Sequence, residues 1–97
     1  MPRFDIRAGA EADLDEAFAW YDAQREGLGL EFLTAIEAAF ALISRSPDAF
    51  PKVYRDVRRV LVRKFPYAVF YTASQEEVSV LACVHARRHP RRWQSRR

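Results

Sequence analysis

The chain begins with alternating apolar and polar residues and then changes to a helical spacing. Phe4 and Ile6 alternate with charged neighbours, a period of two that predicts a short strand with one buried face. Over residues 11–26 the spacing of three and four predicts an amphipathic helix, whose apolar face is formed by Leu14, Ala17, Phe18 and Tyr21. Its early acidic residues suit the helix N-terminus and are expected on a solvated face; these are Glu11, Asp13, Asp15 and Glu16.

Two glycines separate this helix from a second one, which is predicted over residues 30–44. Gly27 and Gly29 interrupt the apolar pattern and allow the chain to turn sharply. The second helix has a continuous apolar stripe of Leu33, Ile36, Phe40 and Ile43. Pro47 disfavours helix beyond Ser46, and together with Pro51 it marks a connecting loop. We therefore expect a hairpin of two helices.

Three strands are predicted in the second half, over residues 57–64, 67–73 and 78–85. These segments are rich in Val, Phe and Tyr, and the breaks between them are short. Short connections favour an antiparallel meander. The tail over residues 87–97 is too highly charged for a core, so we expect it outside, anchored at most by Trp93.

This order of elements predicts an α+β fold: an N-terminal strand, a two-helix hairpin and a three-stranded antiparallel meander. The helices are expected to cover one face of a small twisted sheet and to leave the opposite face open. With 97 residues and 49% apolar residues, the chain is expected to form one domain over residues 1–97.

Composition favours a cytoplasmic protein. The single cysteine, Cys83, cannot form an internal disulfide, which fits a reducing compartment. The longest apolar run, residues 38–43, is far shorter than a membrane span, and the first residues lack the apolar stretch of a signal peptide. No association with a membrane is therefore expected.

The net charge of +3 conceals a strong division between the two halves. Residues 1–53 carry five basic and ten acidic residues, whereas residues 54–97 carry eleven basic and three acidic ones. Ten of the eleven are arginine, which suits planar, bidentate contacts better than lysine does. This half is therefore expected to bind phosphates or an acidic partner in a salt-dependent manner, the alternative being a basic solvated face.

Several polar residues are expected on the open sheet face or along its rim, namely Arg58, Arg63, Lys64, His85 and the arginines after the last strand. Cys83 and His85 share a strand face, but a buried strand cysteine ordinarily fills space, so a Cys–His nucleophile is disfavoured. Adding His89 gives no recognised zinc spacing, and no metal or other cofactor is expected. Trp20 and Tyr21 are adjacent on a helix, so one of them is expected to cover the hairpin or to face a partner.

Short motifs spread over nearly the whole chain add a resemblance to this picture. The helical part contains residues 12–17 leading to Trp20 and Tyr21, and the loop runs from Ser46 and Pro47 to Phe50 and Pro51. The strands contain Val57, Arg58, Arg59, then Phe65, Pro66, Tyr67, Phe70 and Tyr71, and finally Val80, Leu81, Ala82, His85, Ala86, Arg87 and Arg88. In this order the motifs resemble the RelE/ParE superfamily, the toxins of type II toxin–antitoxin systems. The resemblance implies a cognate antitoxin that covers the basic surface.

Members of this superfamily differ in target, and the resemblance implies candidate residues for each case. A RelE-like ribosome-dependent, metal-free mRNA endonuclease would use catalytic residues corresponding to Arg58, Arg63, His85 and Arg87. Residues for binding a target would be Arg59, Lys64, Arg88 and Trp93.

The C-terminal end departs from the endonuclease pattern. Trp93 stands where those enzymes often have a tyrosine, and tryptophan cannot transfer a proton; it can stack on a base or pack the tail onto the sheet. His85 to Arg88 is closer to ParE-like toxins, which poison DNA gyrase. Gyrase is therefore the preferred target over the ribosome with its mRNA, and an inactive nucleic-acid-binding relative is a further alternative.

Overall fold

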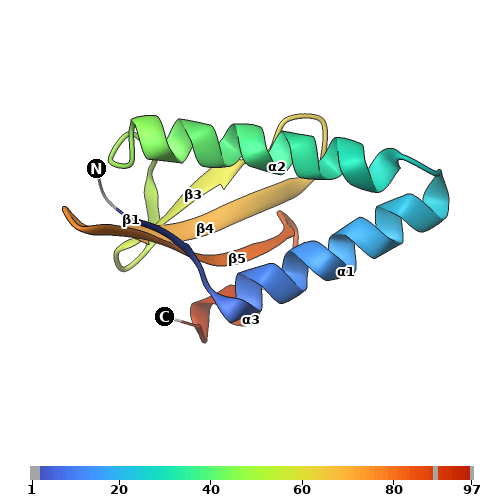
Figure 1. Ribbon diagram of the computed structural model, residues 1–97. Coiled ribbons are helices and arrows are strands. Elements are labelled where there is room, and N and C mark those ends of the chain that lie inside the picture. The colour runs from blue at the N-terminus through green and yellow to red at the C-terminus, as the bar shows by residue number, and fades with distance from the viewer. Residues whose placement is uncertain (1–2, 89, 97) are drawn as a thin grey trace.

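Two long helices lie on one face of a five-stranded sheet, and a short helix lies near the C-terminus (Figure 1). The computed structural model describes residues 3–88 and 90–96. Neither long helix in these residues has the length and apolarity that crossing a membrane requires. In chain order the elements are β1 (Arg3–Ile6), α1 (Ala8–Gln24), α2 (Leu28–Arg45), β2 (Lys52–Tyr54), β3 (Val57–Leu61), β4 (Tyr67–Ala73), β5 (Glu77–His85) and α3 (Arg91–Gln94).

The sheet has the order β1-β5-β4-β3-β2. The predicted antiparallel meander of β3, β4 and β5 is confirmed, and β1 pairs in parallel with β5, with Ile6 opposite Val80. The α+β class and the order of the predicted elements are therefore confirmed. The strand predicted over residues 57–64 is shorter, because β3 ends at Leu61 and the chain turns through Lys64, whose φ is 71°.

Two elements were not predicted. The edge strand β2 has only three residues and an irregular pairing with β3, so it leaves little periodic signal. The short helix α3 belongs to the tail that was expected to lie outside the core. Its Trp93, the residue expected to anchor the tail, is buried on the face of the sheet opposite the long helices, against Phe70 and Leu81.

The expectation of an open sheet face is therefore wrong. Residues 78–84 of β5 are all buried, which means that side chains on both faces of this strand are covered. The helix-covered face packs Val80 against residues such as Phe32 and Ile36, and the other face packs Leu81 and Val84 beneath the tail. A strand with two apolar faces needs a cover on each side, and α3 supplies the second one.

The connection between α1 and α2 positions the helical hairpin. Gly27 precedes α2 with a φ of 91°, a conformation that favours glycine because other residues suffer a Cβ clash there. The Asp22 carboxylate accepts hydrogen bonds from the backbone N–H groups of Gly27 and Gly29, at 3.0 and 3.2 Å. Gly29 also packs so closely on Phe18 that a Cβ would lie 2.8 Å from its ring. Both glycines therefore have specific roles in this turn.

Candidate functional site

Arg58 lies on the helix-covered face of the sheet, which corrects its predicted place on the open face. The alternation along β3 puts Val57 on the outer face and Arg58 on the same side as Val60. The Arg58 guanidinium donates hydrogen bonds to the backbone carbonyls of Asp48 and Phe50, at 3.1 and 2.6 Å. Its side chain is only 17% exposed. Arg58 therefore anchors the loop between α2 and β2.

Tyr71 holds the same loop from the neighbouring strand. It pairs with Arg58 across β3 and β4, and its hydroxyl donates a 2.6 Å hydrogen bond to the carbonyl of Pro47. The ring is fully buried, and this burial raises the pKa of the phenol. Arg58 and Tyr71 together fix the loop, so neither is free to contact a nucleic acid.

Arg63 and Lys64 line a groove beside α2. The groove has a volume of about 420 Å³ and runs between α2 and the turn that connects β3 to β4. Its other walls are Glu31, Thr34, Ala35, Ala38 and Phe65. Both basic side chains are exposed. The arginines that follow β5, Arg87 and Arg88, line a different pocket.

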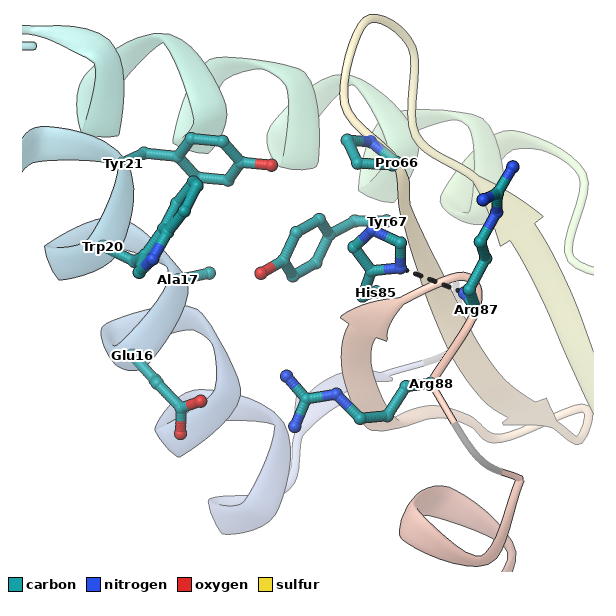
Figure 2. Close-up of a pocket in the computed structure, with 9 residues that line it drawn as sticks. All are labelled: Glu16, Ala17, Trp20, Tyr21, Pro66, Tyr67, His85, Arg87 and Arg88. Atoms are coloured by element: carbon teal, nitrogen blue, oxygen red, sulfur yellow. Dashed lines mark hydrogen bonds between the residues drawn. The ribbon is translucent and has the colours of Figure 1, made fainter. Parts of the chain in front are cut away.

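A second hollow, of about 470 Å³, lies between α1 and the ends of β4 and β5 (Figure 2). We call it the basic pocket. Its helical wall consists of Glu16, Ala17, Trp20 and Tyr21. Its sheet wall consists of Pro66, Tyr67, His85, Arg87 and Arg88. Aromatic rings thus form much of the lining, and arginines stand at one side.

Charge is unevenly distributed around the basic pocket. The Arg88 side chain reaches from the sheet wall toward α1, and the Tyr67 hydroxyl points in the same direction (Figure 2). Burial raises the pKa of Tyr67, and the positive charge of Arg88 partly offsets that rise. Glu16 lies on the opposite wall, 3.7 Å from the guanidinium of Arg92. The pocket therefore combines aromatic walls with hydrogen-bond donors, which suits an apolar side chain accompanied by a carboxylate.

His85 fixes the turn that carries the arginines. Its Nδ1 accepts a 3.1 Å hydrogen bond from the backbone N–H of Arg87. The imidazole ring also packs edge-on against Tyr67, with 5.8 Å between ring centroids. The backbone N–H of Arg88 donates to the His85 carbonyl at 2.9 Å. His85 therefore positions both arginines and lines the basic pocket itself.

Trp20 and Tyr21 take opposite roles, as their adjacency on a helix predicts. Tyr21 is buried among Phe32, Phe65 and Tyr67, with ring centroids 5.0 to 5.9 Å away. Trp20 packs its edge on Tyr21 but is 58% exposed at the mouth of the basic pocket. An exposed tryptophan beside a pocket is a common anchor for a protein partner.

The residues predicted as catalytic are not brought together. Arg58 of β3 pairs with Tyr71 of β4, and His85 of β5 pairs with Tyr67 of β4. Arg58 and His85 are therefore on opposite sides of β4 and four positions apart along it, a separation of about 13 Å along the strand. Arg63 lies on the groove beside α2. Of the four predicted catalytic residues, only His85 and Arg87 share a pocket.

The remaining predicted contacts are divided between the faces of the molecule. Arg88 lines the basic pocket, and Lys64 lines the groove beside α2. Arg59 is exposed and, like Val57, lies on the outer face of the sheet. Trp93 is only 6% exposed, so the structure supports its packing role and leaves its ring inaccessible to a base.

Asp13 and Arg96 form a contact that sequence reasoning missed. The acidic residues of α1 were expected on a solvated face, and Glu11, Asp15 and Glu16 are exposed there. Asp13 is instead only 7% exposed and forms an ion pair with Arg96, at 2.6 Å. The spacing of Asp13 from the buried Ala10 and Ala17 was a usable signal, because it places the carboxylate on the buried stripe.

Cys83 is a buried strand residue rather than a nucleophile. Burial raises the pKa of its thiol to about 12, which disfavours the reactive thiolate. His89 lies outside the described residues. Among residues 3–88 and 90–96, no three His, Cys, Asp or Glu side chains are grouped as metal ligands.

Comparisons with known proteins give a consistent result. The chain is 30% identical over 89 residues to Toxin ParE2 of Mycobacterium tuberculosis, in strains CDC 1551 / Oshkosh and ATCC 25618 / H37Rv. The match covers 91% of this chain and 85% of each relative. The fold is similar to a solved chromosomal ParDE TA system from P. aeruginosa, with a TM-score of 0.78 and 17% identity over 88% of this chain and 96% of that one. No family model matches the chain.

Proposed function

Since this chain belongs to the RelE/ParE family of type II toxins, we propose that it stops bacterial growth by inhibiting DNA gyrase and that a cognate antitoxin neutralises it. The proposal treats the toxin as a protein that binds its target rather than as a nuclease. Its similarity to a ParE toxin, over most of both chains, supports this preference.

The dispersal of the predicted catalytic residues carries the proposal. Metal-free RNA cleavage needs a base, an acid and fixed positive charge within hydrogen-bond reach of one phosphate. Arg58 is bound to loop carbonyls at one end of β4, Arg63 faces α2, and His85 lies at the other end of β4. Binding to a protein imposes no such convergence, so a spread of basic residues is compatible with gyrase inhibition.

The basic pocket is the surface that we assign to recognition. Tryptophan, tyrosine and arginine are the residues that most often dominate protein interfaces, and all three line this pocket. Trp20 is exposed at its mouth, and Arg88 offers its guanidinium to an incoming carboxylate. An antitoxin that covers this surface would block the access of gyrase to it.

One observation keeps the endonuclease as a second candidate. His85, Tyr67 and Arg88 share the basic pocket, and these residue types can exchange protons and hold a phosphate. This alternative predicts ribosome-dependent mRNA cleavage that is lost on Arg87→Ala or Arg88→Ala while the protein stays folded.

Induced expression in a heterologous bacterium tests the proposal, with DNA and protein synthesis labelled separately. Early loss of DNA synthesis with filamentation is the expected result. The Arg88→Glu variant should lose this effect, and Arg45→Glu, a charge reversal at the exposed end of α2, should keep it. Early loss of protein synthesis would favour the ribosome, and undisturbed growth would favour an inactive relative.

A further inference from the structure

One edge of β5 lacks a neighbouring strand over its second half. β1 pairs with β5 as far as Val80, whose carbonyl accepts a 3.0 Å hydrogen bond from the N–H of Arg7. The chain then enters α1 at Ala8, so in the described part of the molecule no strand lies beside residues 81–85 on that side. Backbone groups on a buried strand edge need other hydrogen-bond partners.

Asp13 and Arg96 supply such partners, and we call this pair the C-terminal clamp. The backbone N–H of Cys83 donates to the Asp13 carboxylate at 3.0 Å, and the Arg96 guanidinium donates to the carbonyl of Leu81 at 3.2 Å. The guanidinium also donates to both carboxylate oxygens, at 2.6 and 3.2 Å. The Asp13 side chain is 5% exposed and that of Arg96 27%. A side-chain ion pair therefore takes the place of a strand.

The first turn of α1 accommodates this pair. A Cβ at Gly9 would lie 3.2 Å from the guanidinium carbon of Arg96, tighter than an ordinary contact. The absence of a side chain at Gly9 leaves room for the guanidinium beside the first turn of α1. Arg96 is thus packed as well as hydrogen-bonded.

The C-terminal clamp connects the two walls of the basic pocket. Asp13 precedes Glu16 and Ala17 of the helical wall by about one turn of α1. Arg96 is the last described residue of the tail after β5, the part of the chain that also carries Arg87 and Arg88. We propose that Asp13 and Arg96 are positioning residues of the recognition site, which hold this segment against α1 and so fix Arg88 across the pocket. This inference rests on the proposed function only for the identity of the target.

The clamp acts separately from the packing of Trp93. Trp93 stacks on Phe70 on the outer face of the sheet, whereas Asp13 and Arg96 lie at the edge of β5. Loss of the clamp should therefore open the strand edge and the pocket wall while Trp93 keeps the tail on the sheet.

Cys83 offers a direct probe, because it is the single cysteine of the chain. It lies beneath a small hollow of about 10 Å³ that Asp13, Arg88 and Arg92 also line. Arg96→Ala should raise the rate of Cys83 labelling by a maleimide at least about tenfold, the effect of losing one or two charged hydrogen bonds. Arg25→Ala is the matched control, because this exposed arginine makes its ion pair with Glu31, outside the clamp and the basic pocket. Arg96→Lys should restore part of the protection.

Amide exchange tests positioning without any target. The backbone N–H groups of Arg87 and Arg88 are hydrogen-bonded to His85, so their exchange measured by NMR reports the order of this turn. Arg96→Ala should accelerate both exchanges, and Arg25→Ala should leave them unchanged. The double variant Asp13→Arg/Arg96→Asp keeps the two opposite charges but should fail to restore protection. The backbone N–H of Cys83 needs an acceptor on α1, and the carbonyl of Leu81 needs a donor from the tail.

Gyrase inhibition links the clamp to function. At a temperature where circular dichroism shows Arg96→Ala to be folded, its half-inhibitory concentration should be at least about tenfold above that of the wild type. Failure of the wild type to inhibit gyrase would refute the proposed function. The amide-exchange data would still show whether the clamp positions Arg87 and Arg88. Labelling and exchange rates in Arg96→Ala that equal the wild-type rates would overturn the inference.

Discussion

The indole of Trp93 stacks on the ring of Phe70, with ring centroids 4.1 Å apart and 15° between the planes. Tyr54 meets the same indole edge-on, at 5.9 Å. Through these contacts the tail covers the outer face of the sheet, and residues of β5 such as Val84 become buried. An aromatic residue that was considered for base stacking therefore contributes to the core.

Trp93→Ala should lower the free energy of unfolding by about 3 kcal/mol, the usual cost of removing a buried tryptophan. Urea denaturation followed by circular dichroism measures this change. Trp20→Ala is the control, because Trp20 is 58% exposed, and it should cost less than about 1 kcal/mol. Equal losses in the two variants would contradict the assigned role of the tail.

Arg58→Ala should destabilise the fold rather than remove a contact with the target. Two carbonyls of the loop, from Asp48 and Phe50, would lose a charged donor, at a cost of about 1 to 3 kcal/mol. Arg59→Ala, at the exposed neighbouring position, should change stability by less than about 0.5 kcal/mol. Loss of growth inhibition by a stably folded Arg58→Ala protein would show that Arg58 acts directly.

The two glycines of the helical hairpin should respond differently to alanine. Gly27→Ala meets no atom within 4 Å, so its cost comes from the left-handed backbone and should be about 1 to 2 kcal/mol. Gly29→Ala would place a methyl group 2.8 Å from the Phe18 ring and 2.9 Å from its carbonyl oxygen. A cost at the upper end of about 1 to 3 kcal/mol is expected there. Thermal unfolding of both variants tests this ranking, which an unaffected Gly29→Ala would refute.

Stability should fall at alkaline pH because of Cys83. Burial raises the pKa of its thiol from 9.0 to about 12 in the folded state, so between these values only the unfolded chain releases the proton. The unfolded state then gains stability, by up to about 1.4 kcal/mol per pH unit, and below pH 9 the group has no effect. Burial also raises the pKa of the Tyr71 phenol, so this group likewise lowers the stability of the folded state at alkaline pH. Urea denaturation from pH 8 to 10.5 should show a shallower decline in Cys83→Ala, and identical slopes would contradict this assignment.

The second helix and the meander could be predicted from the sequence because their apolar patterns are clear, whereas α1 was found from the spacing of a few apolar residues and the two glycines that follow it. The continuous apolar run of β5, from Val80 to Val84, also contained the signal that both faces of the strand are covered. The spacing of Asp13 from Ala10 and Ala17 likewise placed a carboxylate on the buried stripe of α1. Both signals lie within a single strand or helix, and sequence patterns are most informative about the burial of residues within one such element.

The partners of these residues could not be predicted in the same way. Arg58 binds carbonyls of a loop, and backbone acceptors have no sequence signature. Arg96 meets Asp13 across 83 positions, and nothing in its neighbourhood distinguishes it from the other arginines of the tail. The candidate site was therefore predicted in its residue types, and the structure was needed to separate anchoring arginines from pocket-lining ones.

Gyrase inhibition is tested most directly by a supercoiling assay with purified toxin, DNA gyrase and relaxed plasmid. Supercoiling should fall with rising toxin concentration, and Arg88→Glu should need at least about tenfold more protein for the same effect. Full supercoiling at a large molar excess of folded wild-type toxin would contradict the proposed target.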